Sequence, residues 1–307
     1  MDLSPPEAGS HVPVLREEVL GFLDLESGQT VVDATLGSGG HALEILKRIG
    51  PEGRLIGIDQ DPDAIERARK NLKSFPRTDF FQKNFTQLDS ILQSLNLPAV
   101  DAVIMDVGLS SDQLQEASRG FSFLTEGPLD MRMNPQGPVT AKDLVNRLSQ
   151  EELAGLFKIY GEERWAKRIA GVLVRTRIKK PVETTGELVR VIQEAVPRRF
   201  HFGRLHPATR VFQALRIRVN QELESLEAGL TKAFEALGPG GRLAVISFHS
   251  LEDRIVKQTF RSWKAEGRGR VLTPKPVRPT SEECERNPRA RSAKLRAIEK
   301  AEIGGGT

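Results

Sequence analysis

The chain has 307 residues, of which 38% are hydrophobic and 28% are charged, a composition typical of a globular protein. Its single cysteine, Cys284, excludes internal disulfides, Cys-rich zinc sites and iron–sulfur clusters. The five histidines lack the spacing of a zinc site, so we expect no protein-held metal. No apolar run approaches the roughly 20 residues that span a bilayer, and residues 1–10 lack the features of a signal peptide. We therefore expect a cytoplasmic protein, without membrane partners, that begins with a loose tail.

The net charge of +4 hides two strongly basic segments. Residues 164–218 contain fourteen Lys or Arg against three Asp or Glu, and residues 254–300 contain fourteen against five. Basic segments on an otherwise acidic chain indicate a polyanionic partner such as a nucleic acid. The alternative is that these side chains only solvate helices and pair with the acidic remainder.

The first third of the chain alternates short apolar runs with helical patterns. Asp61 and Pro62 are suited to the cap and first turn of a helix. This rhythm predicts a parallel sheet covered by helices. The expected strands are 31–35, 54–59, 79–82 and 102–107, and the expected helices are 42–49 and 64–72.

The alternation stops after Val107. Residues 109–138 are rich in Gly, Ser, Pro and polar residues and are expected to form a loop, whereas residues 139–199 carry only helical patterns, including 149–160 and 162–176. We predict a helical insert at 115–210, between two parts of an α/β domain at 1–114 and 211–307.

The last third returns to the α/β pattern. Apolar residues at helical spacing over 211–237 predict one long amphipathic helix, which ends at a Gly-Pro-Gly-Gly sequence. Residues 242–248 are then predicted as a strand, and 294–300 as a final edge strand.

The strongest chemical signal is the sequence VVDATLGSGGH at 31–41, a strand that leads through a Gly-rich turn into a helix. Glycines allow the backbone to approach a ligand, and a helix N-terminus offers free N–H groups. Asp59 ends the next strand, where a carboxylate can accept both ribose hydroxyls. This combination fits a dinucleotide or S-adenosylmethionine. The GxGG spacing departs from the dinucleotide fingerprint. Asp33 ends the first strand where it could face the cationic methionine end, and Asp106 ends a further strand where the methyl group and its acceptor would meet, so the pattern favours S-adenosylmethionine.

At these residues the chain resembles the bacterial ribosomal RNA small-subunit methyltransferase H family, which methylates N4 of a cytosine in the decoding centre of 16S rRNA. The matching stretches run in order along nearly the whole chain. They are HVPVL at 11–15, the turn at 31–41, IMDVGLSSDQL at 104–114, RGFSF at 119–123, LDMRMN at 129–134, HPATRVFQALRI at 206–217, ISFHSLEDR at 246–254 and NPRARSAKLR at 287–296.

The resemblance implies a Rossmann-like class I methyltransferase sheet of seven strands with an inserted all-helical recognition domain. It also implies 16S rRNA, within the small ribosomal subunit, as the partner. The residues that it implies in S-adenosylmethionine binding are Gly39, Gly40, His41, Asp59, Phe85, Asp106 and Gln113. From the sequence alone, Phe85 fits an apolar face for adenine and a plain core position equally well.

Asp106 is the predicted catalytic residue, because the weakly nucleophilic cytosine amine needs alignment and a hydrogen-bond acceptor. Many amino-methyltransferases follow such an acid with Pro-Pro-aromatic, whereas Val107, Gly108 and Leu109 follow here. The alternative role of Asp106 is contact with the cofactor.

Five polar residues are candidates for orienting the substrate, each with a structural alternative such as a helix cap, a loop contact or an ion pair. They are Ser110, Ser111, Arg132, Arg210 and His249. A further set of basic residues is expected to contact RNA phosphates without reading sequence. This set is Arg175, Arg177, Lys179, Lys180, Arg198, Arg199 and Arg204.

Three other functions remain open at this point. They are a methyltransferase acting on another RNA or on a protein, a non-catalytic ribosome-assembly factor, and a nicotinamide-dependent oxidoreductase. The sequence leaves the oligomeric state open, and a homodimer is one option that it allows.

Overall fold

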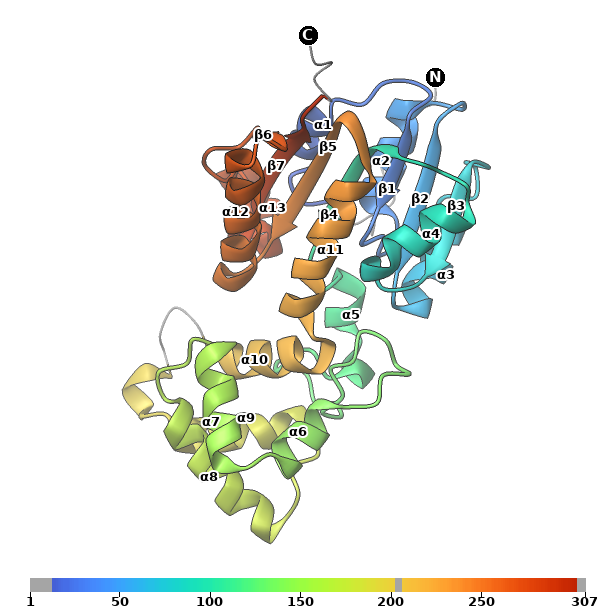
Figure 1. Cartoon of the computed structure of the whole chain (residues 1–307). Coiled ribbons are helices and arrows are strands. Elements are labelled where there is room, and N and C mark those ends of the chain that lie inside the picture. The colour runs from blue at the N-terminus through green and yellow to red at the C-terminus, as the bar shows by residue number, and fades with distance from the viewer. Residues whose placement is uncertain (1–12, 202–205, 303–307) are drawn as a thin grey trace. The chain divides into compact units, whose positions relative to one another are not determined.

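The computed structural model describes residues 13–201 and 206–302, which form two compact units (Figure 1). The first unit comprises residues 1–108 and 224–307, and the second comprises 109–223. The expected tail at 1–10, the start of the HVPVL motif and Arg204 lie outside the described residues. Within the described residues no helix is both long and apolar enough to cross a membrane.

The first unit is built on a seven-stranded sheet with the order β3-β2-β1-β4-β5-β7-β6. Neighbouring strands are parallel except for β7, which runs antiparallel to both β5 and β6. This confirms the predicted α/β class with a mostly parallel sheet. The strands are β1 (Thr30–Asp33), β2 (Arg54–Asp59), β3 (Thr78–Gln82), β4 (Val100–Asp106), β5 (Leu237–Ser247), β6 (Gly269–Val271) and β7 (Lys294–Lys300).

Helices cover both faces of this sheet, which explains why its strands read as continuous apolar runs. Successive residues point to opposite faces, so that Val32 joins the core on one side and Val31 the core on the other. One face packs against α4 (Leu88–Ser94), α11 (Glu222–Ala236) and α12 (Ser250–Ala265), and the other against α1 (Arg16–Leu23), α2 (Gly40–Ile49) and α3 (Pro62–Asn71). A short helix, α13 (Ser281–Arg286), precedes β7. As predicted, Asp61 caps α3 and Pro62 is its first residue.

The second unit is all helical around its own core, which includes Phe157, Leu173, Ile192 and Phe212. Its helices are α5 (Ser111–Gln115), α6 (Ala141–Arg147), α7 (Gln150–Ile159), α8 (Ala166–Lys179), α9 (Thr185–Ala195) and α10 (Ala208–Asn220). The unit thus begins before and ends after the predicted insert at 115–210, because most of α10 belongs to its core.

Three local predictions were wrong. The single helix predicted over 211–237 is two helices, because Gln221 adopts a left-handed conformation with φ of 49° between α10 and α11. The apolar spacing continues across this break and therefore does not reveal it. The strand at 294–300 is not an edge strand, since β6 pairs along its outer side. The loop predicted at 109–138 contains α5, which Ser110 caps.

Candidate active site

The Gly-rich turn joins β1 to α2 at the carboxyl edge of the sheet. Gly37 and Gly39 have φ values of 52° and 89°, which L side chains rarely adopt. Backbone amides fix the turn to its neighbours, since Ala34 N–H donates to the Ile104 carbonyl and Gly37 N–H donates to Asp59 Oδ2 at 2.8 Å. Gly39 offers no side-chain cap to α2, so a ligand can satisfy the first amides of that helix.

Asp59 ends β2 and links this turn to the start of α3. Its Oδ1 accepts the Asp61 N–H at 2.9 Å, and its Oδ2 accepts the Gly37 N–H. Burial raises the pKa of Asp59 to about 6 against these amide bonds, which favour the ionised form. Each carboxylate oxygen has a second lone pair, so Asp59 can still accept hydroxyl groups of a ligand.

Asp106 ends β4 and lies beside His41, the second residue of α2. Asp106 Oδ2 is 3.7 Å from His41 Nε2, and the Asp106 N–H donates to Thr35 Oγ1 at 2.6 Å. Asp106 Oδ1 is buried and has no hydrogen-bond partner within the part of the chain that the structure describes. Burial, together with the charges of Asp33 and Glu252, raises the pKa of Asp106 to about 8.

Asp33, at the end of β1, is the third carboxyl group at this edge. It is buried and accepts the Thr35 N–H at 3.2 Å. Burial raises its pKa to about 7; the Thr35 N–H opposes this shift and the charge of Asp59 adds to it. Three carboxyl groups at the ends of β1, β2 and β4 thus share an edge where ionisation is disfavoured. A cationic ligand with hydroxyl groups would relieve this repulsion, which fits S-adenosylmethionine.

Phe85 lies between this edge and α11. Its ring packs on Gly229, where an added Cβ would come within 2.3 Å of Phe85 Cδ2, and beside Met105. The ring is half-buried, so it belongs partly to the core and keeps some surface for a ligand.

Two of the predicted residues form a helix cap in the second unit. Ser110 Oγ accepts the Gln113 N–H, and Gln113 Oε1 accepts the Ser110 N–H at 3.1 Å. Ser111 is the first residue of the helix that they cap. This reciprocal capping box fixes the start of α5, directly after the chain leaves the first unit.

Arg132 and Arg210 both make contacts within the protein. Arg132 forms a two-pronged ion pair with Asp130, with distances of 2.8 and 2.6 Å, and also donates to the Gly137 carbonyl. Arg210 is exposed and donates to the Glu162 carbonyl at 2.8 Å.

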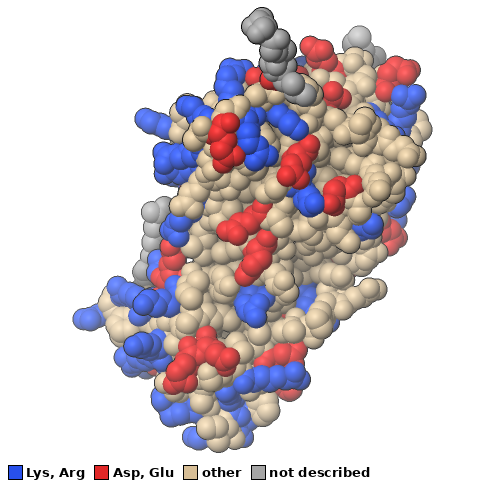
Figure 2. Space-filling view, in the orientation of Figure 1, with Lys and Arg blue, Asp and Glu red and all other residues tan. Residues whose placement is uncertain are grey.

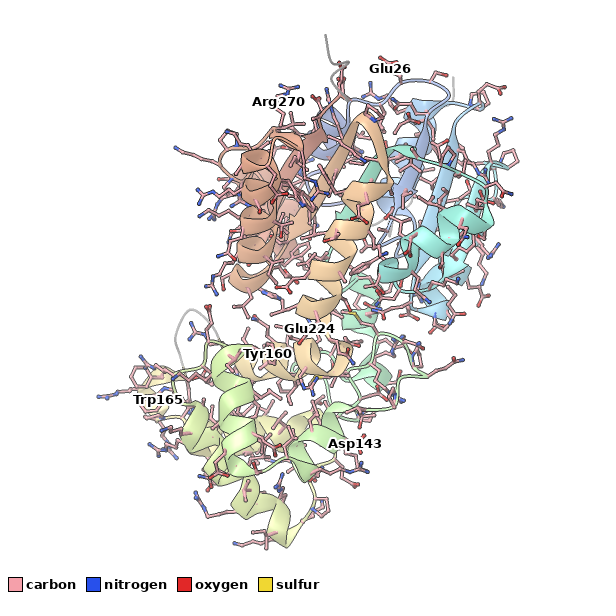
Figure 3. The ribbon with its side chains drawn as sticks, in the orientation of Figure 1. Glu26, Asp143, Tyr160, Trp165, Glu224 and Arg270 are labelled. Carbon is pink, nitrogen blue, oxygen red and sulfur yellow. The ribbon has the colours of Figure 1, made fainter. Side chains whose placement is uncertain are left out.

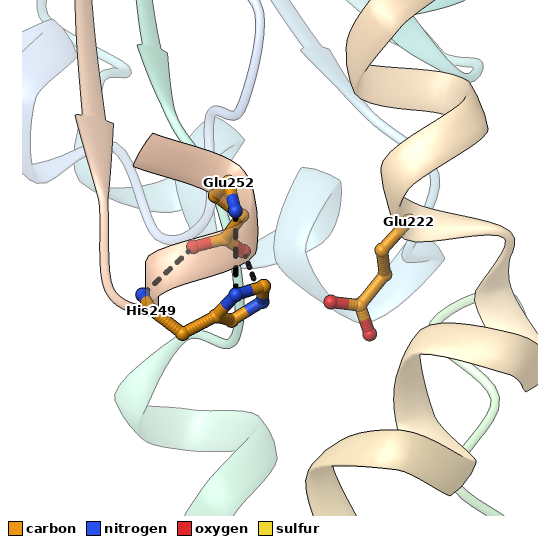
Figure 4. Close-up of side chains that lie close together, drawn as sticks. All are labelled: Glu222, His249 and Glu252. Carbon is orange, nitrogen blue, oxygen red and sulfur yellow. Dashed lines mark hydrogen bonds and ion pairs between the residues drawn. The ribbon is translucent and has the colours of Figure 1, made fainter. Parts of the chain in front are cut away.

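His249 is the N-cap of α12 in the first unit. Its Nδ1 accepts the Glu252 N–H at 3.4 Å, and its Nε2 lies 3.0 Å from Glu252 Oε1 (Figure 4). Glu252 is buried, and its other oxygen accepts the Phe248 and His249 N–H groups. The imidazole thus lies beside a buried carboxylate that backbone N–H groups hold and whose charge acts on Asp106.

This geometry can be set beside known proteins. Residues 8–301 match the MraW methylase family. The chain belongs to this family.

Similar proteins cover almost the same length as this MraW methylase. Over 95% of the chain it is 52% identical to the ribosomal RNA small subunit methyltransferase H of Geobacter sulfurreducens, of which 99% is covered. Over 96% it is 48% identical to the protein of the same name from Symbiobacterium thermophilum, of which 98% is covered. Membership confirms the predicted family and enzyme class, a methyltransferase that depends on S-adenosylmethionine.

Sequence reasoning missed two residues at the site of this MraW methylase. Thr35 holds the end of β4 through its hydroxyl group, and Glu252 is the buried acid that His249 contacts. The His-Ser-Leu-Glu spacing at 249–252 matches a capping box and could have revealed Glu252. No sequence pattern marks the bond made by Thr35, because its partner is 71 residues away.

Proposed function

We propose that this MraW methylase transfers a methyl group from S-adenosylmethionine to N4 of a decoding-centre cytosine in 16S ribosomal RNA. Bacterial relatives about half identical over nearly the whole chain are named ribosomal RNA small subunit methyltransferase H, which supports this acceptor. Such a substrate would place the protein in the bacterial cytoplasm. A homodimer finds no support in these relatives, and we do not propose one.

The observation that carries the proposal is the buried Asp106 oxygen without a hydrogen-bond partner among the described residues. An exocyclic amine is a hydrogen-bond donor that such an oxygen can accept from, and the ionised carboxylate is the stronger acceptor and the form that can take up the amine proton. Without ligand, the raised pKa keeps Asp106 largely protonated at pH 7. S-adenosylmethionine, when bound, supplies an electrophilic methyl group on a positively charged sulfur. Positive charge near Asp106 lowers its pKa, so binding of the methyl donor increases the share of the ionised form.

The remaining site residues bind and orient in this account. Asp59 accepts ribose hydroxyls, Gly39 and Gly40 allow close approach of the ligand to the backbone, and Phe85 offers an apolar face to adenine. His41 lies beside Asp106. The cofactor role of Gln113 and the substrate roles of Ser110, Ser111, Arg132, Arg210 and His249 remain predictions from the sequence.

The test is transfer of labelled methyl groups to RNA in small ribosomal subunits that lack the modification. We expect Asp106→Asn to lower turnover by about 100-fold, the scale of a lost proton acceptor, and Asp59→Asn mainly to weaken cofactor binding. Glu285→Gln, which removes an exposed carboxylate of α13, is the matched control. Label on protein would instead establish a protein acceptor, and cofactor binding without any transfer would indicate an assembly factor.

A further inference from the structure

The second unit contains a cleft that the proposed chemistry does not use. Its volume is about 520 Å³, and its wall is formed by the start of α8, the end of α9 and the residues that follow α9. The side chains with polar ends that line it are Arg168, Gln193, Glu194, Arg198 and His201. Its size suits a nucleotide-sized group.

Positive charge predominates in this cleft. Arg168 and Arg198 are exposed, and neither has a carboxylate within ion-pair distance in the described part of the chain. Glu194 is the only acid among the lining residues that the structure describes. Lys and Arg side chains also gather over much of the face of this unit seen in Figure 2, with smaller acidic groups among them.

Some basic residues predicted to contact RNA are engaged elsewhere. Arg177 donates to the Val145 carbonyl at 2.8 Å, and Lys180 pairs with Glu187 at 2.7 Å. Arg198, in contrast, is exposed and lines the cleft. Arg168, which the prediction did not include, lines the same cleft from α8.

Aromatic contacts hold the Arg198 side of the cleft in place. Arg198 begins a short 3₁₀ helix, Arg198–Phe200, and the Phe200 ring lies 5.6 Å from that of Trp165, which precedes α8 (Figure 3). The guanidinium of Arg164 lies 3.9 Å from the Phe200 centroid, and that of Arg199 lies 4.9 Å from it. Such contacts tie this segment to the residues that precede α8, which places Arg198 and Arg168 in the lining of one cleft before a ligand binds.

We propose that this cleft binds a backbone phosphate of the RNA substrate. Guanidinium groups present planar pairs of donors that match phosphate oxygens, and Gln193 adds an amide donor. The inference rests on the proposed RNA acceptor and assigns one contact to the second unit. The bound group carries no base information, so it positions the RNA and does not select the cytosine.

The experiment measures binding of a decoding-centre fragment of 16S rRNA to the full chain at several salt concentrations. We expect the double variant Arg168→Ala/Arg198→Ala to bind about tenfold more weakly, with a smaller salt dependence that corresponds to about one lost phosphate contact. Glu194→Gln should bind more tightly, because it removes the carboxylate from the cleft. Arg190→Ala, an exposed arginine of α9 outside the cleft, should change affinity less than twofold.

Three measurements distinguish a failure of the cleft proposal from a failure of the proposed function. They are cofactor binding, steady-state kinetics on small subunits, and RNA affinity with its salt dependence. Cofactor binding should be unchanged in the double variant, and its KM for small subunits should rise while kcat is kept. Equal RNA affinity and equal salt dependence in the double variant and Arg190→Ala would overturn the cleft proposal while leaving methyl transfer intact. Tight binding of free cytidine monophosphate or inorganic phosphate to the cleft, with RNA affinity unaffected by the double variant, would also overturn it. RNA binding that depends on the cleft without any methyl transfer would instead refute the proposed activity.

Discussion

Replacing Asp106 by Asn should stabilise the ligand-free protein at pH 8, although the same substitution should lower its turnover. The carboxyl group is buried at the sheet edge, and its charge is opposed by burial and by Asp33 and Glu252. Asn keeps the shape of the side chain but carries no charge. The site therefore carries a cost in stability that serves ligand binding, as is common at functional sites.

The magnitude follows from the pKa of Asp106, which rises from 3.8 to about 8 on folding. About four pH units at 1.36 kcal/mol each give an upper limit of about 5 kcal/mol. The side chain is 26% exposed, and water screens part of this effect, so we expect about 2 kcal/mol at pH 8. Because the folded pKa is raised, the contribution of Asp106 to stability is fully present below pH 3.8 and is lost as the pH rises toward 8.

Urea denaturation at pH 5 and pH 8 measures this difference. The gain of Asp106→Asn over the wild type should be small at pH 5 and largest at pH 8, and saturating S-adenosylmethionine should stabilise the wild type more than the variant. Glu285→Gln should behave as the wild type does at both values. Two results would refute the electrostatic account: a variant less stable than the wild type at pH 8, or the same difference in stability between variant and wild type at pH 5 and pH 8.

Three further substitutions test the structure by denaturation. Gly39→Ala should destabilise by about 1–2 kcal/mol, because φ is 89° and the new Cβ would lie 3.1 Å from Leu72 Cδ1; unchanged stability would contradict this turn. Gln221→Gly should stabilise by about 1 kcal/mol, since φ is 49°, and a loss would show that Gln221 is not left-handed. Arg132→Ala should lower the free energy of unfolding by about 1–3 kcal/mol at pH 7, because it removes the ion pair with Asp130. Burial raises the pKa of Asp130, and the bonds with Arg132 outweigh burial and lower it. That cost should shrink as the pH falls through the lowered pKa, and a constant cost would refute the pair.

The sequence predicted most of the first unit because its physical signals are local. Apolar runs mark strands buried on both faces, and Asp61 with Pro62 marks the start of a helix. The break at Gln221 was missed, because the apolar spacing continues through it and a single left-handed residue does not change that spacing. The place of β7 inside the sheet was also missed, because its outer neighbour β6 has only three residues and no recognisable pattern.

The sequence likewise predicted the placement of some residues of the candidate site but not the cleft in the second unit. Asp59 and Asp106 were predictable because carboxyl ends of parallel strands share one edge, where ligands bind. The cleft around Arg168 and Arg198 was not, because it depends on how α8 packs beside the segment after α9. Counting charges finds the basic segment but cannot tell Arg198, which faces the cleft, from Lys180, which pairs with Glu187.

The most direct test of the central claim is mass mapping of 16S rRNA after small subunits lacking the modification are incubated with the protein and labelled S-adenosylmethionine. The account predicts one added methyl group at N4 of a single decoding-centre cytosine, formed about 100-fold more slowly with Asp106→Asn. Methylation at another atom or another nucleotide, or label on ribosomal protein alone, would contradict it.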